Sequence, residues 1–404
     1  MKIALIGTRG VPARYGGFET CIEEVGQRLV AAGHQVRVYC RPSGVAEHDD
    51  DLDSYLGMEL IHLPVVRKRS VETLAHTALS VFHRSLAGAD AAIVFNSANS
   101  PLLPVIKARG IAVATHVDGL EWRRGKWGPA GQHYYRTAEA LAVRWSDALI
   151  ADAQGIADYY TAEFAAPTEL IAYGAPILTD IGAERVAELD LRPGGYHLVV
   201  ARFEPENHVR EIVAGYTASS AQLPLVVVGS APYADSYTES VRTAADERVR
   251  LLGGLWDQDL IDELYGNALC YWHGHSVGGT NPSLLRAAGA GTFTAAFDVS
   301  FNREVLGEWG DFFSTEADVT ELVDAVEADP EGAADRGRSL QRSIRRYNWD
   351  DVATRYEALC RRLARRDFPR KRPSGRRTGA WDDGAATRTA FGIGAMATRV
   401  ASTA

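Results

Sequence analysis

The feature that most limits the possible folds is a regular alternation of short apolar runs with longer amphipathic segments along this 404-residue chain. Strand-like runs such as Ile3–Gly7 and Gln35–Tyr39 alternate with helical patterns such as Glu19–Ala32. Strands that alternate with helices form parallel sheets, which the helices cover on both faces. A Pro- and Gly-containing stretch at residues 174–195 interrupts this pattern, which then restarts and continues.

The alternation and its interruption together predict an α/β protein with two doubly wound domains that face each other across a cleft. After "YNWDD" a last helix is expected, followed by a Pro-, Gly- and Arg-rich end that is too poor in large apolar residues to form a core. We therefore expect a first domain over residues 1–180, a second over 181–346, a helix over 347–366 that can cross back to the first domain, and a basic, largely disordered tail over 367–404.

Composition narrows the classes of function. Residues 361–404 hold 11 of the 43 Lys and Arg but 3 of the 52 Asp and Glu, so the body is acidic, which argues against duplex nucleic-acid binding. Cys21, Cys40, Cys270 and Cys360 form no Cys-x-x-Cys pair, so neither a zinc site nor a disulfide framework is expected. Without a signal-like start or a membrane-length apolar run, a cytoplasmic protein is expected.

The first candidate binding loop is "GTRGVPARYGGFET", Gly7–Thr20, between the first strand and the first helix. Gly16 and Gly17 let the backbone approach a ligand, the helix start points unpaired N–H groups at an anion, and Arg14 adds charge. The spacing matches neither the dinucleotide pattern G-x-G-x-x-G nor a P-loop. The alternative is that the glycines only make a tight strand-to-helix turn.

A second candidate site follows two strands of the second domain. "RFEPENH" begins with Arg202, whose guanidinium would face the cleft and can hold two phosphate oxygens. In "HSVGGTNPSLLRAAGAGT", Gly278 and Gly279 free the backbone before a helix start suited to phosphate. The alternative is an ordinary, well-capped core helix. The polar groups at this helix start are Thr280, Asn281 and Ser283, and Pro282 suits a first helical turn.

Together these segments resemble a GT-B glycosyltransferase of family four, and within it the bacterial rhamnosyltransferase-like subgroup named after its N-terminal domain. The resemblance rests on "ALIGTRGVPARYGGFET", "HVDGLEWRRGKWG", "VVARFEPENH" and "GGTNPSLL", followed by "FDVSFNREVLG", and covers about residues 1–365. It implies a GT-B fold of two Rossmann-like domains and sugar transfer from a nucleotide diphosphate donor. It also implies no obligatory metal or other cofactor, and retention at the anomeric carbon.

The resemblance also assigns roles by position, with the acceptor on the first domain and the nucleotide on the second. Arg202 would stabilise the departing diphosphate, and His116 and Asp118 would lie near the transferred sugar. Because no carboxylate pair can be placed at one reaction centre, one-face attack is expected, with the diphosphate accepting the acceptor's proton. The expected donor-side residues are Gly16, Gly17, Arg202, Asn207, Gly278, Gly279, Thr280, Asn281, Ser283 and Arg286, and the expected acceptor-side residues are Arg14, Glu19 and Trp122.

The chain departs from the wider family at two places. The family's Glu-x7-Glu signature falls on Gly278 and Arg286, so both carboxylates are missing. A lysine that usually follows the diphosphate arginine is replaced by Asn207 or His208. Either the chain binds its donor poorly, or Arg286 and the "GGTN" groups bind it instead, which we favour because arginine adds positive charge for a diphosphate.

Three weaker sequence signals for binding sites also have a purely structural interpretation. "HDDDLD", His48–Asp53, has the Asp-x-Asp spacing of a metal site, but a solvated loop is the better interpretation. Trp122 is either a platform for a sugar ring or packs its own loop onto the domain. The basic stretch Arg361–Arg377 either contacts anionic lipid or is a solvated tail.

The expected function is a glycosyltransferase that moves a sugar, with rhamnose favoured, to a polysaccharide or lipid-linked acceptor in cell-surface glycan synthesis. It would act in the cytoplasm or at the inner face of the membrane, without a nucleic-acid partner. One alternative is a noncatalytic nucleotide-sugar-binding protein, which the absent glutamates permit. Another is an NAD-dependent oxidoreductase, which fits the sheet but lacks the glycine fingerprint.

Overall fold

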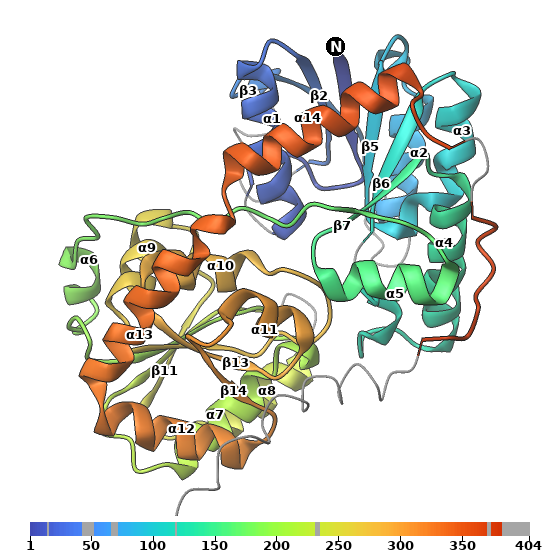
Figure 1. The fold of residues 1–404 in the computed structure, drawn as a ribbon. Helices are drawn as coiled ribbons and strands as arrows, with labels where there is room; N and C mark the ends of the chain where they lie inside the picture. The colour runs from blue at the N-terminus through green and yellow to red at the C-terminus, as the bar shows by residue number, and fades with distance from the viewer. Residues whose placement is uncertain are drawn as a thin grey trace, which may run out of the picture.

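Two mainly parallel sheets form the centre of the structure, one in each half of the chain (Figure 1). The computed structural model describes residues 1–13, 16–42, 52–65, 72–117, 119–230, 235–369 and 373–381. Helices cover both faces of each sheet, which confirms the predicted architecture of two doubly wound domains.

The first sheet has the strand order β3-β4-β2-β1-β5-β6-β7-β8, and only β3 pairs antiparallel among these described strands. Because side chains alternate along a strand, Ile3 and Leu5 of β1 enter one core, and Ala4 and Ile6 enter the core on the other face. The strands are β1 (Lys2–Ile6), β2 (Gln35–Cys40), β3 (Ser54–Tyr55), β4 (Met58–His62), β5 (Ala91–Phe95), β6 (Ala112–His116), β7 (Ala148–Ala151) and β8 (Glu169–Leu170).

Helices α1 and α14 (Trp349–Arg365) cover one face of this sheet, and α2 and α3 cover the other (Figure 1). Helix α2 is followed by a short 3-10 turn. The helices of this domain are α1 (Gly17–Ala31), α2 (Glu72–Phe82), α3 (Leu103–Ala108), α4 (Pro129–Trp145) and α5 (Gln154–Phe164), with 3-10 turns η2 (Arg84–Leu86), η3 (Ser97–Leu102) and η4 (Glu121–Arg123).

The second sheet has the order β11-β10-β9-β12-β13-β14 and its neighbouring strands pair parallel. Its strands are β9 (His197–Val200), β10 (Leu225–Val228), β11 (Val249–Gly253), β12 (Cys270–His273), β13 (Phe293–Phe297) and β14 (Asp311–Phe313). Its helices are α6 (Glu184–Ala187), α7 (Val209–Ala218), α8 (Asp235–Ala244), α9 (Gln258–Asn267), α10 (Pro282–Ala290), α11 (Ser300–Leu306), α12 (Glu316–Ala328) and α13 (Pro330–Ser343), with 3-10 turns η5 (Pro205–Asn207) and η6 (Ile344–Arg346).

Both sheets reverse their strand order at a central pair, β1 beside β5 in the first sheet and β9 beside β12 in the second. In doubly wound sheets, ligands bind at the carboxyl ends of the strands at this switch point. Gly7 follows β1 and Arg202 follows soon after β9, so both candidate loops begin at a switch point.

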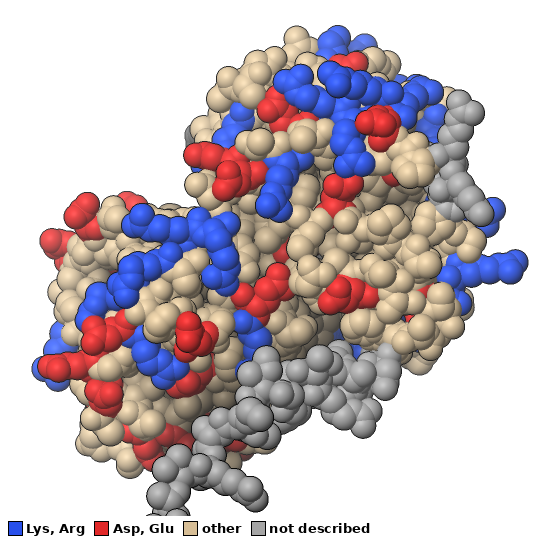
Figure 2. Space-filling view, viewed as in Figure 1, with Lys and Arg blue, Asp and Glu red and all other residues tan. Residues whose placement is uncertain are grey.

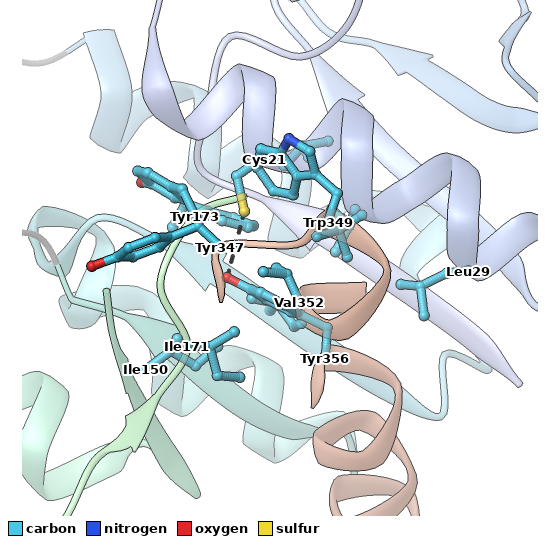
Figure 3. Packing of buried hydrophobic residues seen from close by; sticks show 14 of the residues in the cluster. Cys21, Leu29, Ile150, Ile171, Tyr173, Tyr347, Trp349, Val352 and Tyr356 are labelled. Atoms are coloured by element: carbon cyan, nitrogen blue, oxygen red, sulfur yellow. Dashed lines mark hydrogen bonds between the residues drawn. The ribbon is translucent and has the colours of Figure 1, made fainter. Parts of the chain in front are cut away.

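The chain returns to the first domain through α14, which packs against α1 (Figure 3). Cys21 of α1 and Tyr356 of α14 are buried and form a hydrogen bond of 3.6 Å. Tyr173, Tyr347 and Trp349 belong to the same buried cluster, so one apolar core continues from the first domain into the start of α14. No helix in the described part of the chain is long and apolar enough to cross a bilayer.

The segment after α14 differs from the expected disordered tail. Residues 373–381 lie against α4 and α5, where Arg377 binds Glu139 (2.6 Å), Glu163 (3.2 Å) and the hydroxyl of Tyr159 (2.8 Å). The Trp381 ring meets the Tyr159 ring edge-on at 5.3 Å. Composition predicts disorder because this segment has few apolar residues, but one partly buried arginine with three partners anchors it.

Candidate active site

The first-domain side of the site is the segment between β1 and α1. Gly16 has an extended backbone and precedes α1, and Glu19 of the first turn accepts a hydrogen bond from the backbone N–H of Arg9 (2.9 Å). A Cβ on Gly16 would lie 2.7 Å from Oε2 of Glu19. Gly16 therefore makes room for a buried carboxylate that holds the loop in place. Arg14, a predicted acceptor-side residue, lies outside the described residues.

Gly17 brings this loop into contact with the second domain. A Cβ on Gly17 would lie 3.2 Å from Cγ of Pro282, the first residue of α10, and 3.4 Å from the ring of Tyr173. The N-termini of α1 and α10 therefore approach each other. Unpaired N–H groups at helix N-termini favour anions, so the structure brings the two predicted helix starts to one place.

His116 lies at the carboxyl end of β6 and is completely buried. Its ring stacks between Phe95 (centroids 5.4 Å apart) and Tyr173 (5.8 Å), and Phe18 meets it edge-on. Burial lowers the pKa of His116 to about 3, so the imidazole is neutral near pH 7. Neither ring nitrogen has a hydrogen-bond partner of good geometry among the described residues. Asp118, its predicted partner in catalysis, lies outside them.

On the second domain, Arg202 follows β9 and its side chain is 40% exposed. Its backbone carbonyl accepts a hydrogen bond from Nδ2 of Asn207 (2.8 Å), and Oδ1 of Asn207 lies 2.8 Å from Nδ1 of His275. Asn207 therefore joins the segment after β9 to the segment after β12. Its amide helps to position Arg202.

The glycines of "GGTN" lie where the two domains meet. A Cβ on Gly119 would lie 2.5 Å from backbone atoms of Gly278, and one on Gly279 would overlap Oδ1 of Asp152. Thr280 Oγ1 donates a hydrogen bond to the backbone carbonyl of Asp152 (2.6 Å). These residues thus allow the domains to touch, a role that the sequence alone does not suggest.

The start of α10 is capped as its sequence predicts, since Asn281 Oδ1 accepts a hydrogen bond from the backbone N–H of Ser283 (2.9 Å). Arg286, one turn further along, forms an ion pair with Asp262 of α9. The guanidinium that we expected to compensate for the missing glutamates is therefore already neutralised by a neighbouring carboxylate.

The loop after β6 contributes residues that sequence reasoning missed. Arg124 of this loop forms an ion pair with Glu206 of the second domain (3.3 Å), and Gly125 packs near Pro205. Trp122 lies between the guanidinium groups of Arg123 and Arg136, at 5.3 and 5.0 Å from its ring centroid. The alternating charges in "EWRRGK" are the only local signal for these contacts. The part of the chain that the structure describes contains no cluster of three or more His, Cys, Asp or Glu side chains arranged for a metal ion.

Comparisons with known proteins agree with this geometry. Residues 16–174 match a family model described as a glycosyl transferase 4-like domain. No curated protein sequence matches the chain.

Several solved structures have the same fold. Sucrose-phosphate synthase from Thermosynechococcus elongatus is 20% identical, with a TM-score of 0.75 over 90% of this chain and 98% of that one. HepE from Anabaena in complex with UDP-glucose is 15% identical, with a TM-score of 0.71 over 89% and 99%. A UDP-forming α,α-trehalose-phosphate synthase from Burkholderia xenovorans, in complex with glucose-6-phosphate, is 10% identical, with a TM-score of 0.65 over 89% and 100%. The chain therefore has the GT-B fold, and its residues 16–174 match a glycosyl transferase 4-like domain.

Proposed function

We propose that this protein transfers a sugar, with rhamnose favoured, from a nucleotide diphosphate donor to a glycan acceptor, with retention and without a metal or other cofactor. The observation that carries the proposal is the meeting of both switch-point regions at one junction. There the loop after β9, the start of α10, His116 and the start of α1 lie close to the contact between the domains. HepE is solved in complex with UDP-glucose, and the trehalose-phosphate synthase with this fold is described as UDP-forming, which supports a nucleotide-sugar donor here.

In this proposal each group acts at a stated point of the reaction. As the bond between the sugar and the diphosphate breaks, negative charge builds on the departing phosphate oxygen, and Arg202 stabilises it electrostatically. The neutral imidazole of His116 offers one donor and one acceptor nitrogen to a sugar hydroxyl. The departing diphosphate takes the acceptor's proton, and the new bond forms on the face that the diphosphate leaves.

The acceptor is proposed to be a polysaccharide or lipid-linked glycan at the inner face of the membrane. Lys and Arg side chains gather over α13 and α14 on one face of the molecule (Figure 2). In the basic stretch for which lipid contact was one of two interpretations, Arg377 is held by carboxylates, whereas Arg365 and Arg366 are exposed and no ion pair with a carboxylate forms at either within the described ranges. These two arginines are the better candidates for contact with anionic lipid.

The test is release of nucleoside diphosphate from a panel of nucleotide sugars, with a lipid extract as the source of acceptor. We expect release from one donor and a loss of about 100-fold or more in kcat for Arg202→Ala. Arg144→Ala is the matched control, because Arg144 is exposed at the far end of α4. Donor binding without release from any donor would favour the noncatalytic nucleotide-sugar-binding protein, for which the pairing of Arg286 with Asp262 is the structural argument.

A further inference from the structure

Two arginines from different domains share one carboxylate at the junction. Nη2 of Arg202 and Nη1 of Arg124 both lie 3.9 Å from Oε2 of Glu204. Arg202 follows β9 in the second domain, and Arg124 belongs to the loop after β6 in the first. The guanidinium groups of both domains therefore converge on one point.

A third cation belongs to the same group. Lys126 Nζ lies 3.2 Å from Oε1 of Glu121, beside Arg124. Burial alone would raise the pKa of Glu204, but Arg202, Lys126 and Arg124 act together to hold it below its usual value. Glu204 is therefore surrounded by positive charge from both domains.

The three carboxylates of the group are held differently. Glu121 and Glu206 are almost fully buried and bind Arg124 at 2.5 and 3.3 Å. Glu204 lies 3.9 Å from both arginines and also hydrogen-bonds the side chain of Glu206. Glu121 and Glu206 thus hold Arg124 in place, whereas Glu204 is the carboxylate that lies between the arginines of the two domains.

Two of the predicted donor-side groups of the second domain already have partners within that domain. The amide of Asn207, at a position where a lysine is expected, is bound to the Arg202 carbonyl and to His275. Arg286 is paired with Asp262. The pKa of His275 lies well below its usual value, through burial and the nearby Arg124, His273 and Arg202, so His275 is neutral. Of the two predicted donor-side arginines, Arg202 is the one that contacts Glu204 at the junction.

We infer that Arg124 and Lys126 of the first domain bind the terminal phosphate of the nucleotide diphosphate together with Arg202, with Glu204 displaced when it binds. The inference rests on the proposed function and deepens it. Because the cations belong to both domains, the terminal phosphate binds fully only when the domains are in contact. A nucleoside monophosphate lacks this phosphate, so we predict that it contacts neither Arg124 nor Lys126.

The test compares diphosphate with monophosphate binding by calorimetry, with UDP against UMP and dTDP against dTMP as probes. Arg124→Gln and Lys126→Gln are each expected to weaken diphosphate binding about tenfold or more, as for a lost charge-assisted hydrogen bond. Monophosphate binding is expected to change less than about twofold, since no contact with the terminal phosphate is removed. Arg144→Gln is the matched control and should change neither.

Further variants separate phosphate binding from a structural role. Arg124→Lys keeps a cation and should restore most of the diphosphate affinity that Arg124→Gln loses. Glu206→Gln breaks the interdomain ion pair of Arg124 but leaves the cation, so it should weaken diphosphate binding less than Arg124→Gln. If Arg124→Gln does not fold, the same binding measurements are made on Lys126→Gln alone, because Lys126 is partly exposed.

The outcomes are distinguishable. Equal weakening of diphosphate and monophosphate binding, or unchanged diphosphate binding in both glutamine variants, overturns the inference and leaves the proposed function standing. A wild-type protein that binds none of the four nucleotides overturns the proposed function and the inference with it.

Discussion

Gly119 of the first domain and Gly278 of the second lie so close that a Cβ on Gly119 would stand 2.5 Å from backbone atoms of Gly278. Gly278 has φ +149°, a conformation that other residues rarely adopt, so neither position tolerates a side chain in this arrangement. The pair joins the loop after β6 to the loop before α10, which carry the first-domain cations and the predicted "GGTN" groups. The approach of the two domains thus depends on this glycine pair.

Gly119→Ala should therefore keep the domains from reaching this contact while leaving each core intact. We expect kcat/KM to fall about 10- to 100-fold, because small misplacements of reacting groups are costly, with little change in the melting temperature. Gly128→Ala is the control, since a Cβ there meets no atom within 4 Å. Unchanged turnover in Gly119→Ala would show that this contact does not matter for catalysis.

Local patterns predicted the architecture well, because burial on both faces leaves a continuous signal in the sequence. The expected strand Gln35–Tyr39 lies within β2 (Gln35–Cys40), whose last three residues are all buried. The two-residue β3 and the three-residue β14 were missed, since strands so short show no periodicity. Glycine, proline and capping residues likewise marked the loops of the candidate site.

The missing parts of the site depend on contacts between distant segments. Arg124 forms an ion pair with Glu206 across the junction, and no local sequence pattern predicts a partner so far along the chain. The same reason explains why composition predicted a disordered tail while Arg377 is anchored by Glu139 and Glu163. Ionic contacts between segments that are far apart along the chain are thus not predictable from the sequence.

The Arg377 anchor should contribute to the stability of the first domain. Arg377→Met would leave Glu139, with a side chain 1% exposed, without its cation, and breaking a buried pair in this way costs about 3–5 kcal/mol. Because Arg377 is itself 21% exposed, we expect the lower part of that range in urea unfolding. Arg376→Met is the matched control, because Arg376 is the neighbouring arginine and its side chain is exposed. Equal unfolding free energies for the two variants would contradict the anchor.

His116 should make the protein sensitive to acid. Its pKa is lowered by burial from 6.5 to about 3, so between these values the unfolded chain takes up a proton that the folded protein cannot. Stability should then fall as the pH drops below about 6.5, by at most about 1.4 kcal/mol per pH unit for this residue. His116→Phe keeps the ring stack and removes the titration. In urea unfolding at pH 7, 5.5 and 4, the free energy of unfolding should fall less with decreasing pH in the variant than in the wild type. A constant difference across this range would mean that His116 titrates normally.

The start of α14 is connected to the site through a row of rings. Trp349 lies 6.5 Å from Tyr173, which stacks on His116 at 5.8 Å, and a Cβ on Gly174 would overlap the Trp349 indole. Gly174→Ala should therefore displace Trp349, and overpacking of this kind costs about 1–3 kcal/mol.

A double-mutant cycle tests whether this clash is the cause. Trp349→Leu removes the indole, so Gly174→Ala should cost less in that background, with a coupling of about 0.5–3 kcal/mol measured by urea unfolding. Because Tyr173 contacts both Trp349 and His116, Gly174→Ala should also lower turnover in the wild-type background. Additive unfolding free energies would place the effect of Gly174→Ala elsewhere than at Trp349, and α14 would then influence the site only by holding the two domains together.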